Sequence, residues 1–409
     1  MSRLDELIAE LCPNGVEYKA IGEIATNFFR GSGIKREDLT EDGSPCIRYG
    51  EIYTTYGIWF DSCISHTKIE KIVSPKYVEY GDILFAITGE SVEEIAKSTA
   101  YLGRERCLVG GDIVVLRHQQ NPKYISYALA TTDAQRQKSA GKVKSKVVHS
   151  SIPSISAIRI PVPPLPVQQE IVRILDSFTE LTAELTAELT ARKRQYDYYR
   201  DQLFSFDSHV TSLPISEIAD TNIGLATSVT KHKVGQGVQL LHNSDIQQNR
   251  IVVKNYEYIS KEFAEKNKKK ILRKGDIITV HTGDVGTSAV INDEFDGSIG
   301  FTTITTRIKD ISFVDPEFLC NYLNSQVCKR QITAMTISDR NNLNQSSFEK
   351  INVPIIPIHM QREITVTLAK LDELCNDISD GLPAEIAARQ KQYEYYRDKL
   401  LTFQELKVE

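Results

Sequence analysis

The sequence predicts an α+β protein with two globular domains in a pseudo-two-fold arrangement, separated by two long antiparallel coiled-coil helices. Two observations predict this fold class. The chain contains an internal duplication, because short sequence segments from its first half recur in the same order in its second half. Each copy also ends in a long stretch with helical spacing of apolar residues. A chain of 409 residues exceeds one ordinary core, since domains usually hold about 100–200 residues.

The repeat keeps its register along the whole chain. VEYKAIGEIA from Val16 aligns with VTSLPISEIA from Val210, an offset of 194 (210 − 16). The same offset pairs Gly81-Asp82-Ile83 with residues 275–277, and Thr88-Gly89-Glu90 with residues 282–284. IRIPVPPLPVQQEI from Ile158 matches INVPIIPIHMQREI from Ile351, and YDYYRDQLFSF from Tyr196 matches YEYYRDKLLTF from Tyr393. We therefore expect one fold, built twice.

Each copy divides into a globular part and a helical part. The globular parts mix short β-branched runs with turn residues and a few helical stretches, which is typical of α+β domains. They cover residues 1–160 and 208–353. The helical parts cover residues 161–207 and 354–409.

The first helical part opens with prolines and then runs from Val167 to Phe206 without Pro or Gly, which predicts one long helix. Its apolar positions follow the 3-4 spacing of a coiled-coil seam. They are Ile171, Ile174, Phe178, Leu181 and Leu185, and after a step of four at Leu189 the seam resumes through Arg192, Tyr196, Tyr199, Leu203 and Phe206. That step is a stutter, which lengthens a helix and keeps its seam in line. The repeated Thr-Ala-Glu-Leu at 182–189 is thus a spacer, and Leu181, Leu185 and Leu189 lie on the apolar side of this part of the helix.

The second helical part contains Asp380-Gly381-Leu382-Pro383, and a proline so deep in a helix should break or kink it. If a two-fold axis relates the copies, the second helix runs back towards the first domain. We therefore expect antiparallel helices and a C-terminus near Leu4–Leu11.

Composition excludes several classes of protein. A charged fraction of 25% and a hydrophobic fraction of 41% are typical of a soluble globular protein. The sequence contains neither a long apolar run nor a secretory signal, so we expect a cytoplasmic protein. Seven cysteines without a Cys-x-x-Cys pair predict reduced thiols and no metal site. The net charge of −5 argues weakly against nucleic acid, although a global charge hides local patches.

The layout and the two helical phrases resemble the specificity (S) subunit of type I restriction-modification enzymes. The similarity is closest to the IC-like family, whose central helix carries Thr-Ala-Glu-Leu repeats. The phrases are VQQEIVRILDSFTELTAELTAELTARKRQYDYYRDQL from Val167, and GLP at 381–383 with RQKQYEYYR from Arg389. In the globular parts only short motifs such as Gly-Asp-Ile match the family. The resemblance implies that these parts are target recognition domains, which vary with the DNA that they read.

The resemblance also implies a function. The chain would be non-catalytic, would bind a bipartite asymmetric site in double-stranded DNA, and would recruit two modification (methyltransferase) subunits and the restriction (helicase-nuclease) subunits. It would hold no cofactor itself, because S-adenosylmethionine, ATP and Mg²⁺ belong to those partners. A generic two-domain DNA-binding scaffold is the non-enzymatic alternative.

A DNA adenine methyltransferase is the enzymatic alternative. Phe29-Arg30-Gly31-Ser32-Gly33 has the form of an S-adenosylmethionine loop, and Asn121-Pro122-Lys123-Tyr124 resembles the catalytic Asn-Pro-Pro-Tyr. A glycine-rich loop of this kind needs a helix after it, whereas residues 34–38 are short and polar. Asn121-Pro122 and Asp315-Pro316 occupy equivalent positions, which favours helix N-caps in both copies.

Candidate DNA-contacting residues are chosen by side-chain chemistry. Lys and Arg contact phosphates, and Arg, Asn, Gln, Lys and Ser contact base edges. Solvated loops are the plain alternative for such runs. Candidates are Lys138, Lys142, Lys144 and Lys146, with His149 after them, in the first copy, and Lys268, Lys269, Arg273, Arg340, Asn341, Asn342 and Asn344 in the second. The tyrosine-rich helix ends are candidates for subunit contact: Tyr198, Tyr199, Arg200, Tyr395, Tyr396 and Arg397.

Overall fold

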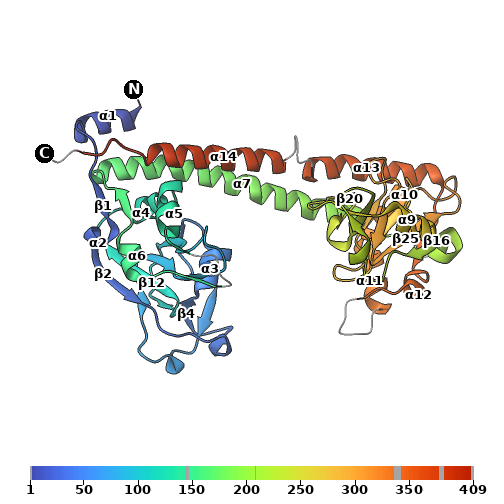
Figure 1. Cartoon of the computed structure of the whole chain (residues 1–409), viewed down its shortest axis with the longest axis horizontal. Helices are drawn as coiled ribbons and strands as arrows, with labels where there is room; N and C mark the ends of the chain where they lie inside the picture. The colour runs from blue at the N-terminus through green and yellow to red at the C-terminus, as the bar shows by residue number, and fades with distance from the viewer. Residues whose placement is uncertain (1, 143–146, 208, 336–341, 377–381, 407–409) are drawn as a thin grey trace. The chain divides into compact units, whose positions relative to one another are not determined.

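A computed structural model describes residues 2–142, 147–207, 209–335, 342–376 and 382–406. The chain forms two compact units (Figure 1). Unit 1 contains Met1–Leu185 and Ile386–Glu409, and unit 2 contains Thr186–Glu385. Both units combine sheets and helices, as predicted.

Unit 1 is built on two five-stranded sheets. The central sheet has the order β2 (Ala25–Arg30), β12 (Ile113–His118), β8 (Ile83–Ala86), β10 (Ser98–Tyr101) and β5 (Trp59–Phe60). The outer sheet has the order β3 (Leu39–Thr40), β6 (Ser65–Thr67), β4 (Ser44–Ile47), β11 (Cys107–Val109) and β7 (Tyr77–Val78). Two short pairs complete the strands: β1 (Tyr18–Ala20) with β14 (Arg159–Pro161), and β9 (Thr88–Gly89) with β13 (Val148–His149). The short helices are α1 (Arg3–Leu11), α2 (Ile21–Ile24), α3 (Tyr49–Thr54), α4 (Pro122–Leu129), α5 (Thr132–Ser139) and α6 (Ile152–Ser156).

Strand β8 is a continuous apolar run in the sequence, and the structure explains why. All four of its side chains are buried, because both faces of the central sheet are covered. Ile83 and Phe85 pack with α4 in one core, whereas Leu84 and Ala86 pack with α3 and the outer sheet in another. A strand buried on both faces loses the usual alternation of apolar and polar residues.

Unit 2 repeats this plan with one strand fewer in each sheet. Its central sheet has the order β16 (Ala219–Ile223), β25 (Thr303–Ile308), β22 (Ile277–Val280) and β23 (Ser288–Val290). Its outer sheet has the order β17 (Lys233–Val234), β21 (Glu257–Ile259), β18 (Val238–His242) and β24 (Ile299–Phe301). The short pairs are β15 (Ser212–Pro214) with β26 (Asn352–Pro354), and β19 (Ile246–Gln247) with β20 (Arg250–Ile251). Its short helices are α8 (Ile215–Ile218), α9 (Lys261–Lys266), α10 (Pro316–Asn324), α11 (Gln326–Met335) and α12 (Gln345–Phe348).

The repeated Gly-Asp-Ile phrase marks the same ion pair in both units. The buried Asp82 carboxylate accepts the backbone N–H of Glu79 at 2.9 Å and the Arg117 guanidinium at 3.2 Å. In unit 2, Asp276 accepts Arg307 at 2.6 and 2.8 Å. Each aspartate fixes the turn that leads into its central strand, which explains why the phrase recurs.

The predicted long helix is α7 (Leu165–Leu203), 39 residues without interruption. Its first part belongs to unit 1 and its last part to unit 2. The second helical part divides into α13 (Ile358–Asn376) and α14 (Leu382–Leu400), with Pro383 in the first turn of α14. The break or kink predicted near Pro383 falls on residues 377–381, which lie outside the described part of the chain, and it stays a prediction.

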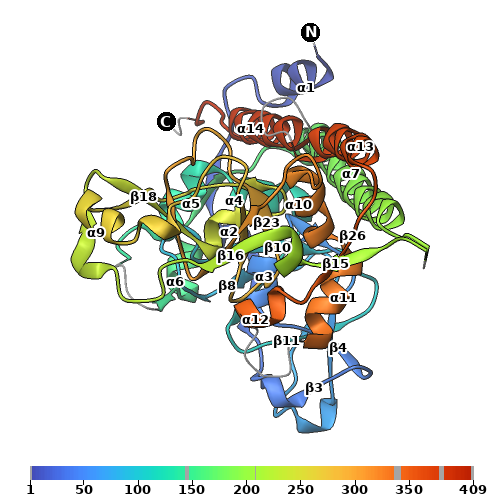
Figure 2. The same cartoon turned by 90° about the vertical axis from the view of Figure 1, so that its right-hand side faces the viewer.

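In unit 1, α14 lies beside the first part of α7 and runs antiparallel to it (Figure 1). The Tyr396 ring stacks on Phe178, with centroids 5.4 Å apart. In unit 2, α13 lies beside α10 (Figure 2), and its Leu368 shares a core with Tyr196 of α7. The apolar seam is less regular than predicted, because Leu181 is 36% and Tyr199 44% exposed.

The C-terminal segment returns to the first domain, as predicted. Val16 pairs with Glu405 in a parallel bridge, and the Val16 N–H donates to the Gln404 carbonyl at 2.8 Å. Arg159 forms an ion pair with Glu405 at 2.8 Å. Leu4 of α1 and Leu401 lie in one core cluster.

The cysteines differ in part from the prediction of reduced thiols. Cys63 and Cys107 are 44 residues apart in sequence but form a disulfide in unit 1, so that expectation is wrong for this pair. Spacing in the sequence does not reveal that the loop after β5 meets the start of β11. Cys12, Cys46, Cys320 and Cys328 are free and buried. Among the described helices, none is long and apolar enough to cross a membrane.

Candidate nucleic-acid interface

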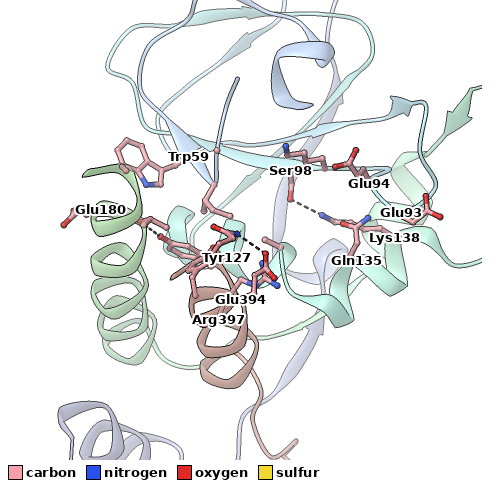
Figure 3. Close-up of a pocket in the computed structure, with 18 residues that line it drawn as sticks. Trp59, Glu93, Glu94, Ser98, Tyr127, Gln135, Lys138, Glu180, Glu394 and Arg397 are labelled. Carbon is pink, nitrogen blue, oxygen red and sulfur yellow. Dashed lines mark hydrogen bonds between the residues drawn. The ribbon is translucent and has the colours of Figure 1, made fainter. Parts of the chain in front are cut away.

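Lys138 is not a surface cation, which corrects its assignment to the DNA-binding set. Its side chain is 4% exposed, and its ammonium donates to Ser98 Oγ at 3.2 Å (Figure 3) and to the Leu129 carbonyl at 2.8 Å. Burial lowers the pKa of Lys138 to about 7. The reason is helical geometry: α5 continues through Lys138, which lies one turn after the buried Ala134. A basic run in the sequence cannot show that one of its lysines faces inwards.

Lys138 instead lines a cavity of about 810 Å³ in unit 1. Figure 3 shows its mixed lining, in which Trp59, Tyr127 and Arg397 occur together with four carboxylates around the cavity. The carboxylates are those of Glu93, Glu94, Glu180 and Glu394. The four carboxylates outnumber the three cations of the lining, which are Lys97, Lys138 and Arg397. Like charges repel, so this cavity is a poor site for a DNA phosphate. Among the described residues, no group of three or more His, Cys, Asp or Glu side chains could hold a metal ion.

The rest of the two polar loops is only partly described. Lys142 is half-buried, and Lys144 and Lys146 lie outside the described residues. In the second copy Arg340 and Asn341 also lie outside them, whereas Asn342 is exposed. Asn344 caps α12, because its Oδ1 accepts the Ser347 N–H at 2.8 Å. Asn344 therefore has a structural task that the sequence analysis missed.

The lysine cluster of unit 2 lies on α9 and the turn after it. Lys268 is exposed and lies 3.7 Å from Glu265. Lys269 and Arg273 are exposed, and within the described part of the chain neither side chain forms an ion pair. An exposed cation without an acidic partner is the type of group that phosphates require. These two residues stay candidates for phosphate contact.

The structure also joins two features that the sequence analysis kept apart. In unit 1, Thr88–Gly89 pairs with Val148–His149, directly after the basic loop. In unit 2, Thr282 pairs with Asn342, directly after the equivalent loop. Thr88 and Thr282 were missed as site residues, although their recurrence in the repeated Thr-Gly-acid phrase was a visible signal.

Both motifs of the methyltransferase alternative have structural roles. The strand β2 ends inside Phe29–Gly33, and the next helical element is a three-residue turn at Arg36–Asp38 rather than a long helix. Asn121 caps α4, since its side chain accepts the Tyr124 N–H at 3.1 Å. The buried Tyr124 hydroxyl donates to the Pro161 carbonyl at 2.9 Å. Asp315 caps α10 in the same way, which confirms the interpretation as helix N-caps.

The tyrosine-rich helix ends divide into buried and exposed side chains. Tyr196 and Tyr393 are 5% and 6% exposed, whereas Tyr198 and Tyr395 are both 61% exposed. Tyr198 contacts Tyr199 edge to face, and Tyr395 contacts Tyr396 in the same manner. Each helix end therefore contains a tyrosine pair, in which Tyr198, Tyr199 and Tyr395 are exposed, whereas Tyr396 is half-buried against Phe178.

The arginines of these ends do not belong to that exposed surface. Arg200 is 1% exposed, packs over the Tyr196 ring and pairs with Asp197 at 2.8 Å. The Arg397 side chain is 13% exposed and pairs with Asp398 at 2.8 Å. Burial therefore argues against Arg200 as a contact residue for another subunit, whereas the half-buried Arg397 stays a prediction.

Sequence comparison identifies the family. A family model for the type I restriction modification DNA specificity domain matches the chain twice, over residues 13–192 and 210–388. The specificity subunit of the Escherichia coli type I restriction enzyme EcoR124I/EcoR124II is 33% identical over 62% of this chain and 65% of its own length. A putative type I specificity subunit of Haemophilus influenzae is 31% identical over 64% of this chain and 68% of its own length. The alignment with the first relative thus spans less than two thirds of that protein.

A solved structure supports the fold. It comes from work on the structural basis of complex assembly and conformational transition in a type I restriction-modification system. The similarity has a TM-score of 0.64 at 15% sequence identity and covers 96% of this chain and 98% of that one. The predicted family and the predicted class, a specificity subunit rather than an enzyme, agree with these matches.

Proposed function

Because this chain belongs to the type I restriction-modification DNA specificity family, we propose that it is the sequence-recognition subunit of such a complex. Each domain reads one half of a bipartite, asymmetric site in double-stranded DNA. The duplicated fold carries this proposal: two sheets, an N-capped helix and a bridge beside a polar loop recur in both units. Domains with one fold but different loops suit two different half-sites.

The complex would supply the chemistry that this chain lacks. Modification subunits would bind S-adenosylmethionine and methylate adenine, and restriction subunits would use ATP and Mg²⁺ to cleave DNA. The exposed side chains of Tyr198, Tyr199 and Tyr395 are the surfaces that we assign to partner subunits, since aromatic side chains are enriched at protein interfaces. The cytoplasm, where chromosomal DNA is accessible, would be the site of action.

A domain exchange tests the proposal. Residues 1–157 would be replaced by those of a relative with another target, and the chimera would be expressed with the modification subunits. The methylated sites would then be read by sequencing genomic DNA. We expect one half-site to change and the other to stay. A folded, assembled chimera in which both halves change would refute the assignment of one reader to each domain.

Methyl transfer by the purified chain separates this function from the enzymatic alternative. Incubated alone with DNA and labelled S-adenosylmethionine, the chain should transfer no methyl group. Addition of the modification subunits should restore transfer. Transfer by the chain alone would support the methyltransferase instead.

A further inference from the structure

The two backbone bridges beside the polar loops are equivalent in detail. In unit 1 the Ser150 N–H donates to the Ile87 carbonyl at 2.8 Å. In unit 2 the Leu343 N–H donates to the His281 carbonyl at 2.9 Å. Donors and acceptors lie 63 (150 − 87) and 62 (343 − 281) residues apart. The same short ladder therefore joins the same two segments in each domain.

Each ladder is an extension of the most deeply buried strand of its unit. Thr88 follows β8 and Thr282 follows β22, and every side chain of these two strands is buried. The backbone of Gly89 is also tightly enclosed, because an added Cβ would lie 2.8 Å from the Tyr53 hydroxyl. A site on rigid elements can hold side chains in one geometry, which recognition requires.

The side chains on the ladders combine a common element with a variable one. The common element is the threonine: Thr88 Oγ1 lies 3.3 Å from Nδ1 of His149 on the paired segment, whereas Thr282 Oγ1 lies 2.8 Å from Nδ1 of His281, its neighbour in the chain. The variable element is at the position of His149, which corresponds to Asn342 at an offset of 193 (342 − 149).

His149 and Asn342 are both exposed, and both keep hydrogen-bonding atoms available. Within the described residues, His149 Nε2 and the Asn342 side-chain amide have no hydrogen-bond partner. An imidazole nitrogen makes one hydrogen bond, as donor or as acceptor. A carboxamide donates and accepts at once, which matches the N7 and N6 edge of adenine.

We propose that the two ladders are the base-reading edges of the domains, with His149 reading a base in one half-site and Asn342 reading an adenine in the other. This inference rests on the proposed function. The backbone bridge to the shared threonine sets the position of the reading residue, and the exchange of histidine for asparagine makes the half-sites different. Lys269 and Arg273, in contrast, would contact phosphates and contribute affinity without specificity.

Four variants in complex with the modification subunits test the inference. Binding would be measured to a set of duplexes in which each target base is replaced in turn, and methylated sites would be sequenced in parallel. His149→Ala should relax discrimination at one position of one half-site by about 5- to 150-fold, the range for one good base contact. Asn342→Ala should do the same at an adenine of the other half-site. His209→Ala and Asn255→Ala, exposed side chains outside the ladders, should leave every position unchanged.

The outcomes distinguish a failure of the proposed function from a failure of the inference that the ladders read bases. If the wild-type complex recognised no bipartite site, the proposed function would fail. If it recognised one and both ladder variants kept full discrimination everywhere, only the present inference would fail. A uniform loss of affinity across all duplexes would also overturn it, because that is the signature of a phosphate contact. In each variant the half-site of the other domain is the internal control for folding and assembly.

Discussion

The side-chain oxygen of Gln168 accepts the backbone N–H of Asn121 at 3.0 Å and so attaches the start of α7 to the start of α4. The Gln168 amide also donates to the Pro163 carbonyl at 2.8 Å. The second copy repeats the joint, because Gln361 accepts the Asp315 N–H at 2.9 Å and donates to the Ile356 carbonyl at 2.8 Å. Both glutamines are fully buried. In each unit a buried glutamine therefore joins the long helix to the N-cap residue of an earlier helix, Asn121 of α4 or Asp315 of α10.

Removing either glutamine should destabilise its unit. Gln168→Ala and Gln361→Ala each leave buried backbone groups without partners, which costs about 1–3 kcal/mol. Urea unfolding would measure the loss, and hydrogen exchange would locate it in unit 1 or unit 2. The neighbouring exposed Gln169 supplies the matched control, since Gln169→Ala should change stability by less than about 0.5 kcal/mol. Equal effects of Gln168→Ala and Gln169→Ala would show that the joint contributes nothing.

Gly15 should be required for the return of the C-terminal segment. Its φ is +107°, and an added Cβ would lie 2.5 Å from the Gln404 carbonyl oxygen. Gly15→Ala should therefore open the contact between Val16 and residues 404–406 and speed proteolysis and amide exchange there. Gly33→Ala, where a Cβ meets nothing within 4 Å, is the control. Unchanged protection of residues 403–406 in Gly15→Ala would contradict this role.

Much of the architecture was accessible from the sequence, because a duplicated chain and helical spacing both leave local signals. The repeat predicted paired units, the absence of Pro and Gly after Val167 predicted the long helix α7, and Asn121 and Asp315 predicted helix N-caps. The orientation of single side chains was not accessible. Lys138 and Arg200 read as exposed cations, yet tertiary packing buries both. The partnership of Thr88 with His149 spans 61 residues (149 − 88), and such pairing follows from the sheet rather than from any local pattern.

The buried Lys138 should make stability depend on pH. Its pKa in the folded protein, about 7, lies below the ordinary value of 10.5. Between these values the unfolded chain binds more protons than the folded one, so stability rises with pH, by at most about 1.4 kcal/mol per pH unit. The difference in unfolding free energy between the wild type and Lys138→Met should increase from pH 7 to pH 9 and be constant below pH 6. A constant difference across the whole range would show that Lys138 keeps its proton when buried.

The exposed tyrosines should matter for assembly and not for folding. Tyr198→Ala and Tyr395→Ala remove side chains that are 61% exposed, so unfolding temperatures should change little. If these side chains anchor the modification subunits, binding should weaken by about 1–4 kcal/mol, the range for aromatic interface anchors. Calorimetric titration of the chain with purified modification subunits measures this. Tyr80→Ala, which removes a side chain that is 68% exposed, is the control, and equal affinity of all three variants would exclude the helix ends as anchors.

The Thr-Ala-Glu-Leu repeat should set the number of base pairs between the half-sites. Residues 182–189 lie inside α7, and each unit is close to one self-contained turn. Thr182 and Thr190 donate to the carbonyls four residues before them, at 2.9 Å each, and Thr186, Ala187 and Glu188 are exposed. Another unit can thus be added without new packing. It lengthens the helix by about 6 Å and rotates it by about 400°, which leaves about 40° of residual rotation. One base pair rises about 3.4 Å and turns about 35°, so one unit corresponds to one or at most two base pairs, and the family resemblance favours one.

Insertion of a third Thr-Ala-Glu-Leu after Leu189 should lengthen the unspecified gap by one base pair and leave both half-sites unchanged. Deletion of one unit should shorten the gap or abolish recognition, because the change of length is the same in the other direction. Insertion of four alanines separates length from chemistry: the same longer gap would show that helix length alone is read. The gap would be measured from the methylated sites of cells that carry each variant with its partner subunits. An unchanged gap in a folded, active insertion variant would mean that the repeat fills the helix without measuring the DNA, since a rigid spacer cannot change length and leave the distance between the readers the same.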